Sequence, residues 1–373
     1  MYHDRLCILM KRNICQIIGY FDQPNINPKM KRVILRNFSN ERYNFFLFVQ
    51  SNMSPTCPEG YLGNCGNTHF FRHSQQLYDL LVRSQIHYIV LSIDFFGLYN
   101  CIERFDQDRI YYIGHGITPF YYQENTVKYF GPWKETKMNI LTCCNAQYEI
   151  VSKHKENIYK IGSIPQFDNL LLTGDNLTNK KPCIYIIGPR RNDTNSYKNM
   201  STLLASVRNQ WRGIIAYKRT GIADLDHSFY TNHGIYVQDP RDLIYSYYSS
   251  EIIVIFDGGT SYLEALMVNA KVILYIEGLG TDFKRPSYMS EVHYIEILHY
   301  VIFPYKDYPS LLVAGSPEEF NDKLSIIKNN PGYFSSEQYV KDKNQFIKDS
   351  IGEYVPDVGR QLIDIIEQKD GSS

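Results

Sequence analysis

The stretch Ser249–Tyr275, SSEIIVIFDGGTSYLEALMVNAKVILY, decides the fold. Residues 252–256 form an apolar run that predicts a buried strand, and the apolar spacing of 261–268 predicts an amphipathic helix. A second apolar run at 272–276 predicts another strand. A strand, a helix and a strand in this order form a unit with parallel strands, and the glycines between the first strand and the helix would let a ligand approach the backbone.

Short β-rich runs alternate with helical patterns over nearly the whole chain, which is typical of parallel sheets with crossover helices. Strands are expected at residues 14–20, 44–49, 87–93, 110–114, 138–143, 183–187, 213–217, 235–237, 252–256 and 272–276. Helices are expected at residues 75–84, 145–154, 196–207, 241–248, 261–268, 318–327, 336–349 and 358–368. The pattern predicts an α/β protein with two Rossmann-like, doubly wound sheets and helices at its C-terminus.

A polar segment, GDNLTNKK at 174–181, separates the two sets of strands and predicts a linker. We expect an N-terminal Rossmann-like domain at 1–173 and a C-terminal one at 182–330, with the helices of 331–373 free to pack back on the first domain. Two such domains in series place a cleft between the carboxyl ends of their sheets, where ligands of these folds bind. An enzyme is therefore the expected class of protein.

The composition excludes several other classes. The 373 residues include 39 Lys and Arg and 39 Asp and Glu, and this zero net charge argues against a nucleic-acid-binding protein. No apolar run is long enough for a transmembrane helix, and the first residues lack a signal-peptide pattern. The eight cysteines form no CxxC pair, as expected of reduced thiols in the cytoplasm. The 32 tyrosines are typical of AT-rich coding sequence, which suggests a microbe or a virus.

The turn at 257–259 and the helix after it predict a site for an anionic ligand. The free N–H groups of a helix's first turn attract anions, and the hydroxyls of Thr260 and Ser261 can cap the helix or donate to a phosphate. Glu264 lies one turn further along, where its carboxylate could reach sugar hydroxyls. An ordinary capping box is the alternative, because Ser261-x-x-Glu264 fits that pattern.

A candidate general base lies in the first half of the chain. The strand predicted at 110–114 ends in Gly114-His115-Gly116, where small neighbours leave the imidazole ring unobstructed. Histidine titrates near neutral pH, which suits a base that takes a proton from an attacking hydroxyl. A structural, hydrogen-bonding histidine is the alternative.

Basic residues follow two strands of the second half. Arg190 and Arg191 come soon after strand 183–187, and paired guanidinium groups can hold a diphosphate. Lys218 and Arg219 are candidates of the same kind, and a solvated loop is the alternative for each pair. No P-loop, GxGxxG turn or HExxH cluster occurs, so neither a metal nor another cofactor is expected. The candidate donor-binding residues are Gly188, Arg190, Arg191, Lys218, Asp257, Gly258, Gly259, Thr260, Ser261 and Glu264.

Three motifs follow one another in a distinctive order: HGITP at 115–119, IGSIPQFDNL at 161–170, and the block from Ser250 to Tyr275 with its Glu-Ala-Leu. In this order they resemble the GT-B superfamily, and most closely the CDP-glycerol glycerophosphotransferase-like proteins that act on cell-surface polymers. That family has an HGTP motif, here with Ile117 inserted, then a vGxPxxDxL segment and an EAL block. The resemblance extends from about residue 80 to 365.

The resemblance implies that His115 is the base and that Thr260, Ser261 and their neighbours bind the diphosphate of an activated donor. The family has a second histidine in a K.HP motif, where this chain reads AYKRT at 216–220. This difference favours sugar transfer over glycerophosphate transfer. Glu264 agrees, since an acidic residue in this block is typical of GT-B enzymes that hold ribose or sugar hydroxyls.

We therefore expect a metal-independent GT-B glycosyltransferase that transfers a sugar or a polyol phosphate from a nucleotide donor to a glycan or surface polymer, as in polysaccharide biosynthesis. The donor would bind the C-terminal domain and the acceptor the N-terminal one, and charge stabilisation by the basic residues suffices without a metal. Peripheral membrane association stays open. The alternatives are a CDP-glycerol-type glycerophosphotransferase, a nucleotide-sugar epimerase using Asp94, Asp257 and Glu264, and a non-catalytic glycan- or nucleotide-binding protein.

Overall fold

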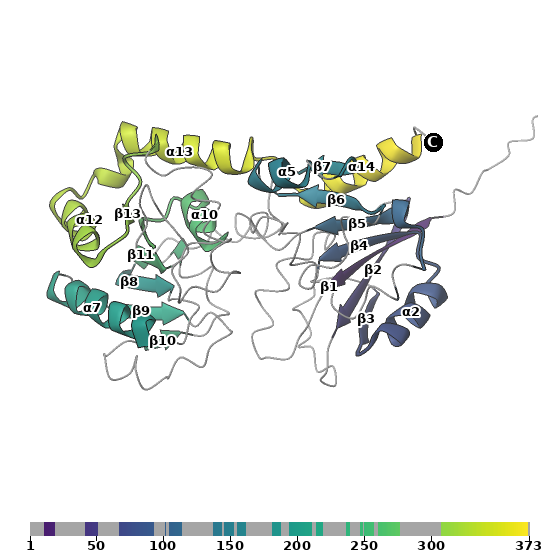
Figure 1. Ribbon diagram of the computed structural model, residues 1–373, viewed down its shortest axis with the longest axis horizontal. Helices are drawn as coiled ribbons and strands as arrows, with labels where there is room; N and C mark the ends of the chain where they lie inside the picture. The colour runs from purple at the N-terminus through teal and green to yellow at the C-terminus, as the bar shows by residue number, and fades with distance from the viewer. Residues whose placement is uncertain are drawn as a thin grey trace, which may run out of the picture.

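The protein contains two separate parallel sheets, one from each half of the chain, with helices packed around them (Figure 1). The computed structural model describes residues 11–18, 42–50, 67–92, 101, 104–113, 137–143, 145–152, 155–161, 181–187, 194–210, 214–218, 236–238, 247–248, 250–256, 260–276 and 307–371. All statements below on structure concern these residues.

The first sheet has seven strands in the order β3-β2-β1-β4-β5-β6-β7, and every neighbouring pair is parallel. Its strands are β1 Arg12–Ile18, β2 Tyr43–Gln50, β3 Thr68–Phe71, β4 Tyr88–Ser92, β5 Ile110–Ile113, β6 Asn139–Thr142 and β7 Ile158–Lys160. The strand order reverses between β1 and β4, which is the topological switch point of a doubly wound sheet.

The second sheet has six strands in the order β10-β9-β8-β11-β12-β13, again all parallel. Its strands are β8 Lys181–Ile187, β9 Ile214–Lys218, β10 Tyr236–Gln238, β11 Ser250–Phe256, β12 Val272–Tyr275 and β13 Val313–Ala314. This is the 3-2-1-4-5-6 order of a dinucleotide-binding sheet, with its switch point between β8 and β11.

Helices cover both faces of the sheets. They are α2 Ser74–Arg83, α5 Asn145–Val151, α7 Thr194–Gln210, α10 Thr260–Met267, α12 Pro317–Asn329, α13 Glu337–Ile351 and α14 Val358–Gly371, with 3-10 turns at Gln107–Arg109 and Tyr333–Ser335. Among the described helices, none is both long enough and apolar enough to span a bilayer.

Burial on both faces explains why β11 is a continuous apolar run in the sequence. Ile253 and Ile255 of β11 pack with α10 on one face, whereas Ile252 and Val254 pack with α7 and α12 on the other. Successive side chains of a strand point to opposite faces, so a sheet covered on both faces needs apolar residues at every position. The continuous run at 252–256 is therefore the mark of a central strand.

The last helix packs on the first sheet, far from α12. Leu362, Ile363 and Ile366 of α14 are buried in the same cluster as Val90 and Tyr111, which belong to central strands of that sheet. Helix α13 links the two regions: it contacts α10 of the second half and α5 of the first, where the Asn145 side-chain amide donates to the Asp349 carbonyl at 2.5 Å.

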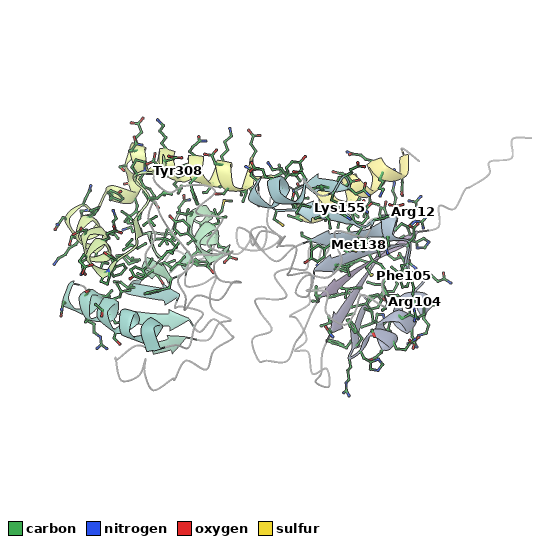
Figure 2. All side chains as sticks on the ribbon, in the orientation of Figure 1. Arg12, Arg104, Phe105, Met138, Lys155 and Tyr308 are labelled. Atoms are coloured by element: carbon green, nitrogen blue, oxygen red, sulfur yellow. The ribbon has the colours of Figure 1, made fainter. Side chains whose placement is uncertain are left out.

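Polar contacts fix α14 at the amino ends of the strands. Asp370 accepts hydrogen bonds from Arg12 and Tyr88, the first residues of β1 and β4, and Figure 2 shows Arg12 at this end of the sheet. Burial, together with the Asp370 carboxylate, raises the pKa of Tyr88 to about 12. Lys369 donates to the side-chain oxygen of Asn139 at 2.9 Å. The C-terminal end of the chain is thus an integral part of the first sheet's packing.

The predicted fold class is confirmed, with differences at the level of elements. Sequence patterns did not predict three short strands, β3, β7 and β13. The helix predicted at 241–248 lies within the described residues only at 247–248, which are helical, and the linker at 174–181 lies outside them, so the domain boundaries stay a prediction. Among the described residues, the buried cysteines Cys15, Cys101 and Cys143 belong to no disulfide, and burial raises the pKa of the Cys15 thiol.

Tyr339 offers a test of the packing around α13. Its side chain is buried, and its hydroxyl has no hydrogen-bond partner among the described residues. An unpaired buried hydroxyl costs about 1–3 kcal/mol of desolvation, so we expect Tyr339→Phe to leave the free energy of unfolding unchanged or to raise it by about 1 kcal/mol. Chemical denaturation measures this change. A loss of about 1 kcal/mol or more would show that the hydroxyl is hydrogen-bonded.

Candidate functional site

The strand ends of the second sheet bring the predicted donor-binding segments to one place. Ile187, the last residue of β8, pairs with Ile255 of β11 on one side and with Lys218 of β9 on the other. The strands that precede Gly188 and Asp257 therefore end side by side, at the switch point where ligands of such sheets bind. Lys218 is the last residue of β9 and lies at the same edge of the sheet.

Helix α10 begins at this edge. It starts at Thr260, four positions after β11 ends at Phe256, and its first turn presents free N–H groups. Ser261 lies in that first turn and is half-buried. The helix begins one residue earlier than the sequence pattern predicted, so Ser261 is inside the helix and is not its N-cap.

Glu264 has a different partner from the one that a capping box requires. Its Oε2 atom accepts a hydrogen bond from the hydroxyl of Tyr247 at 2.8 Å, and the carboxylate is 7% exposed. In a capping box the glutamate would instead accept from the N-cap backbone amide. The capping-box alternative is therefore wrong, and Glu264 is a buried residue in the second turn of α10.

Other predicted residues lie outside the described part of the chain, so their roles stay predictions. They are His115, Gly188, Arg190, Arg191, Asp257, Gly258 and Gly259. For His115, the structure does establish the strand that precedes it: β5 ends at Ile113 and lies next to β4, one strand from the switch point of the first sheet. Lys218, Thr260, Ser261 and Glu264 are the predicted residues that the described structure brings to one region.

Tyr247 is the residue that sequence analysis missed. It lies 17 positions before Glu264, and its side chain is 1% exposed. It is one of 32 tyrosines, and no motif distinguishes it from the others. Only the packing of the segment before β11 against α10 reveals its contact.

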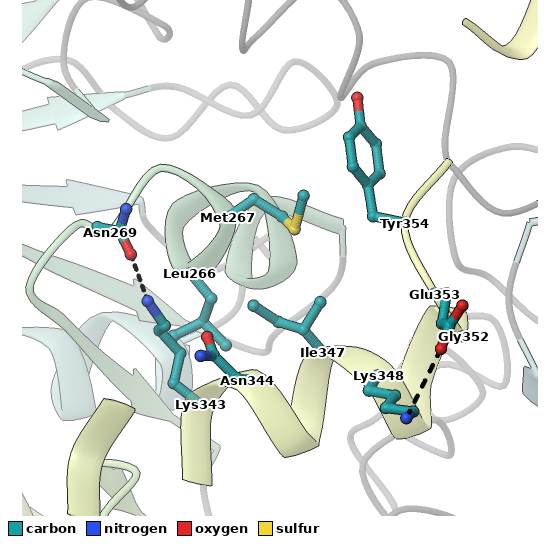
Figure 3. A pocket seen from close by; sticks show the side chains of 10 residues that line it. All are labelled: Leu266, Met267, Asn269, Lys343, Asn344, Ile347, Lys348, Gly352, Glu353 and Tyr354. Atoms are coloured by element: carbon teal, nitrogen blue, oxygen red, sulfur yellow. Dashed lines mark hydrogen bonds and ion pairs between the residues drawn. The ribbon is translucent and has the colours of Figure 1, made fainter. Parts of the chain in front are cut away.

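A groove of about 320 Å³ lies at the other end of α10 (Figure 3). It is lined by Leu266, Met267, Asn269, Lys343, Asn344, Ile347, Lys348, Gly352, Glu353 and Tyr354. Lys343 donates to the side-chain oxygen of Asn269, and burial lowers the pKa of Lys343. Lys348 forms an ion pair with Glu353 at 3.8 Å. None of the predicted site residues lines this groove, and its polar groups tie α13 to α10.

The described residues contain no group of three or more His, Cys, Asp or Glu side chains that could hold a metal ion. The described part of the site offers instead the N–H groups of α10, the hydroxyl of Ser261 and the carboxylate of Glu264. Amide and hydroxyl donors suit a phosphate, and a carboxylate suits sugar hydroxyls. The arrangement can therefore hold the phosphate and sugar parts of a nucleotide.

The sequence matches no protein-family model and no curated protein. The structure is similar to that of a candidate UDP-N-acetylglucosamine 2-epimerase from Listeria monocytogenes, with a TM-score of 0.65 and 9% identity over 97% of this chain and 98% of the other. It is also similar to the UDP-GlcNAc 2-epimerase from Neisseria meningitidis bound to UDP-GlcNAc, with a TM-score of 0.60 and 9% identity over 95% of this chain and 100% of the other. For a glycosyltransferase from Rickettsia africae ESF-5, the TM-score is 0.56, with 10% identity over 96% of this chain and 98% of the other. Identities this low show the fold alone: the chain has the two-sheet GT-B fold.

Proposed function

We propose that the protein is a glycosyltransferase of the GT-B type, which transfers a sugar from a nucleotide-activated donor to a hydroxyl of a glycan or surface polymer. The observation that carries the proposal is the meeting of β8, β9 and β11 at one edge of the second sheet, after which the chain enters α10, the helix that carries Glu264. This is the position at which doubly wound sheets bind nucleotides.

The donor would lie across this edge. Its diphosphate would accept hydrogen bonds from the N–H groups of α10 and from Ser261, with Lys218, Arg190 and Arg191 neutralising its charge. Glu264 would accept hydrogen bonds from the ribose or sugar hydroxyls. A leaving nucleoside diphosphate stabilised in this way needs no metal, and a metal-free reaction is part of the proposal.

The acceptor would lie on the first sheet. His115 follows β5 by two residues, and its imidazole would take the proton from the attacking acceptor hydroxyl as the bond to the sugar forms. The sequence pattern HGITP supports this role, which is a proposal for a residue outside the described part of the chain.

A nucleotide-sugar 2-epimerase is the second candidate, and one observation favours it. The Listeria and Neisseria proteins, which are named as 2-epimerases, share the two-sheet fold with this chain. An epimerase would invert one carbon of the sugar and would need no acceptor. It would use carboxylates near the donor, for which Asp94, Asp257 and Glu264 are the candidates.

Donor binding is tested first. We expect at least one of the UDP-, GDP-, CDP- or dTDP-linked sugars to raise the melting temperature of the full-length protein, because a ligand that binds only the native state stabilises it by mass action. CDP-glycerol in the same panel tests the glycerophosphotransferase alternative. The proposal fails if no compound of the panel shifts the transition.

Once a nucleotide sugar is found to bind, the products formed from it distinguish a glycosyltransferase from an epimerase. A glycosyltransferase releases nucleoside diphosphate when glycan acceptors are added, and His115→Ala abolishes that release without abolishing donor binding. An epimerase forms a second nucleotide-sugar isomer in the absence of any acceptor, which NMR of the reaction mixture detects. Donor binding with neither product would indicate the non-catalytic alternative.

A further inference from the structure

We propose that Tyr247 is a positioning residue for the donor site: its hydroxyl fixes the carboxylate of Glu264 in the orientation that accepts hydrogen bonds from the ribose hydroxyls of a nucleoside diphosphate. The inference rests on the proposed function and extends it to a residue that no sequence motif marks. It starts from the hydrogen bond of 2.8 Å between the Tyr247 hydroxyl and Oε2 of Glu264.

Within the described part of the chain, the carboxylate of Glu264 accepts fewer hydrogen bonds than its two oxygens allow. A carboxylate offers about four lone-pair sites on its two oxygens, and among the described residues Tyr247 is the sole hydrogen-bond donor to Glu264. No ion pair with a described Lys, Arg or His compensates this buried group. Buried carboxylates are usually compensated by several donors or by a cation, so a single neutral donor leaves lone pairs of Glu264 for the donors of a ligand.

Two adjacent hydroxyl groups are donors that can pair with one carboxylate. A ribose presents its 2′- and 3′-hydroxyls on neighbouring carbons, so both can donate to one carboxylate. Glu264 lies on the same helix as Thr260, whose turn carries the free N–H groups for the phosphates. A nucleoside diphosphate could therefore place its phosphates at the first turn of α10 and its ribose hydroxyls at Glu264.

Tyr247 can fix the carboxylate because it is itself held rigidly. Its ring is buried in the hydrophobic cluster that includes Ile253 of β11 and Leu263 of α10. A buried tyrosine has only two side-chain torsions, whereas a glutamate has three and adopts many orientations without a partner. With Oε2 held by Tyr247, the second oxygen is kept in one orientation before the ligand arrives, which reduces the entropy that binding must remove.

The test compares Tyr247→Phe with the matched control Tyr339→Phe, which removes a buried hydroxyl from α13 without removing a described hydrogen bond. The probes are UDP, GDP and CDP, each paired with its 2′,3′-dideoxy analogue, and calorimetry gives the dissociation constants. We expect Tyr247→Phe to weaken the binding of the ribose form by about tenfold, as for the loss of one hydrogen bond to a charged group. Binding of the dideoxy form is expected to change little, so the preference for ribose falls.

A purely structural role for Tyr247 gives a different result. It would lower the melting temperature and weaken both nucleotides equally, so an unchanged ribose preference in Tyr247→Phe overturns the inference and leaves the proposed function intact. The inference is also overturned if Tyr339→Phe loses as much of the preference for ribose as Tyr247→Phe does. If none of the ribose nucleotides binds the wild-type protein, the inference and the proposed donor site are both wrong.

Discussion

Ile363→Asp is expected to destabilise the full-length protein more than any other substitution considered for α14. Ile363 is 0% exposed in α14, within the cluster that also contains Val90 and Tyr111 of the first sheet. An unpaired carboxylate at this position loses its hydration and finds no partner, a change that costs more than about 4 kcal/mol. Since whole domains are stable by only about 5–15 kcal/mol, a loss of this size removes a large part of the stability of the protein.

The milder variant Ile363→Ala tests the same packing with a loss of stability that can be measured. We expect the free energy of unfolding to fall by about 2–5 kcal/mol, the usual cost of truncating a buried isoleucine. Arg360→Asp is the control on the exposed face of α14, where the Arg360 side chain forms a surface ion pair with Asp364 at 3.0 Å. Its loss is expected to cost less than about 1 kcal/mol. Equal stability of Ile363→Asp and Arg360→Asp in urea denaturation would show that α14 is not packed on the first sheet.

The case of α14 shows what a sequence pattern can predict and what it cannot. The spacing of Val358, Leu362 and Ile366 predicts an amphipathic helix, and the helix exists at Val358–Gly371. The same spacing does not say which apolar surface the helix covers. That choice depends on the length of α13, which extends from α10 to α5, and on partners such as Arg12 and Asn139, which are distant in sequence from Asp370 and Lys369.

Short edge strands were missed for a related reason. β13 consists of Val313 and Ala314 alone, and it is a strand because it pairs with Leu274 and Tyr275 of β12. A run of two residues has no periodicity of its own to detect. The central strand β11 was predicted because burial on both faces imposes a long apolar run on it.

The residues of the candidate site also differ in whether the sequence alone could identify them. Glu264, Ser261 and Lys218 could be predicted because each occupies a defined place relative to the end of a strand, and strand ends of one parallel sheet meet at one edge. Tyr247 could not, because its role depends on a side-chain contact across two elements. The prediction that Glu264 belongs to the site thus came from topology, whereas its hydrogen-bond partner Tyr247 could be found only from the packing.

Glu264→Gln is expected to weaken the binding of a nucleoside diphosphate by about 10- to 100-fold, because hydrogen bonds to a charged acceptor contribute about 1.5–3 kcal/mol and a neutral amide oxygen accepts more weakly. The amide has nearly the same shape, and its oxygen can still accept from the Tyr247 hydroxyl, which the structure places 2.8 Å from Oε2. Stability is therefore expected to stay close to that of the wild type. Calorimetric titration measures the affinity, and thermal denaturation measures the stability.

Glu264→Ala separates the two functions of this side chain. Truncation leaves the hydroxyl of Tyr247 without this partner and opens a cavity beside α10, so we expect it to lose both nucleotide affinity and about 1–3 kcal/mol of stability. Neither variant should change the affinity for a 2′,3′-dideoxy nucleotide by as much, because that ligand offers no hydroxyl to the carboxylate. If Glu264→Gln binds the ribose nucleotide as tightly as the wild type does, Glu264 is a packing residue. The hydroxyls of the donor must then be bound by another part of the cleft.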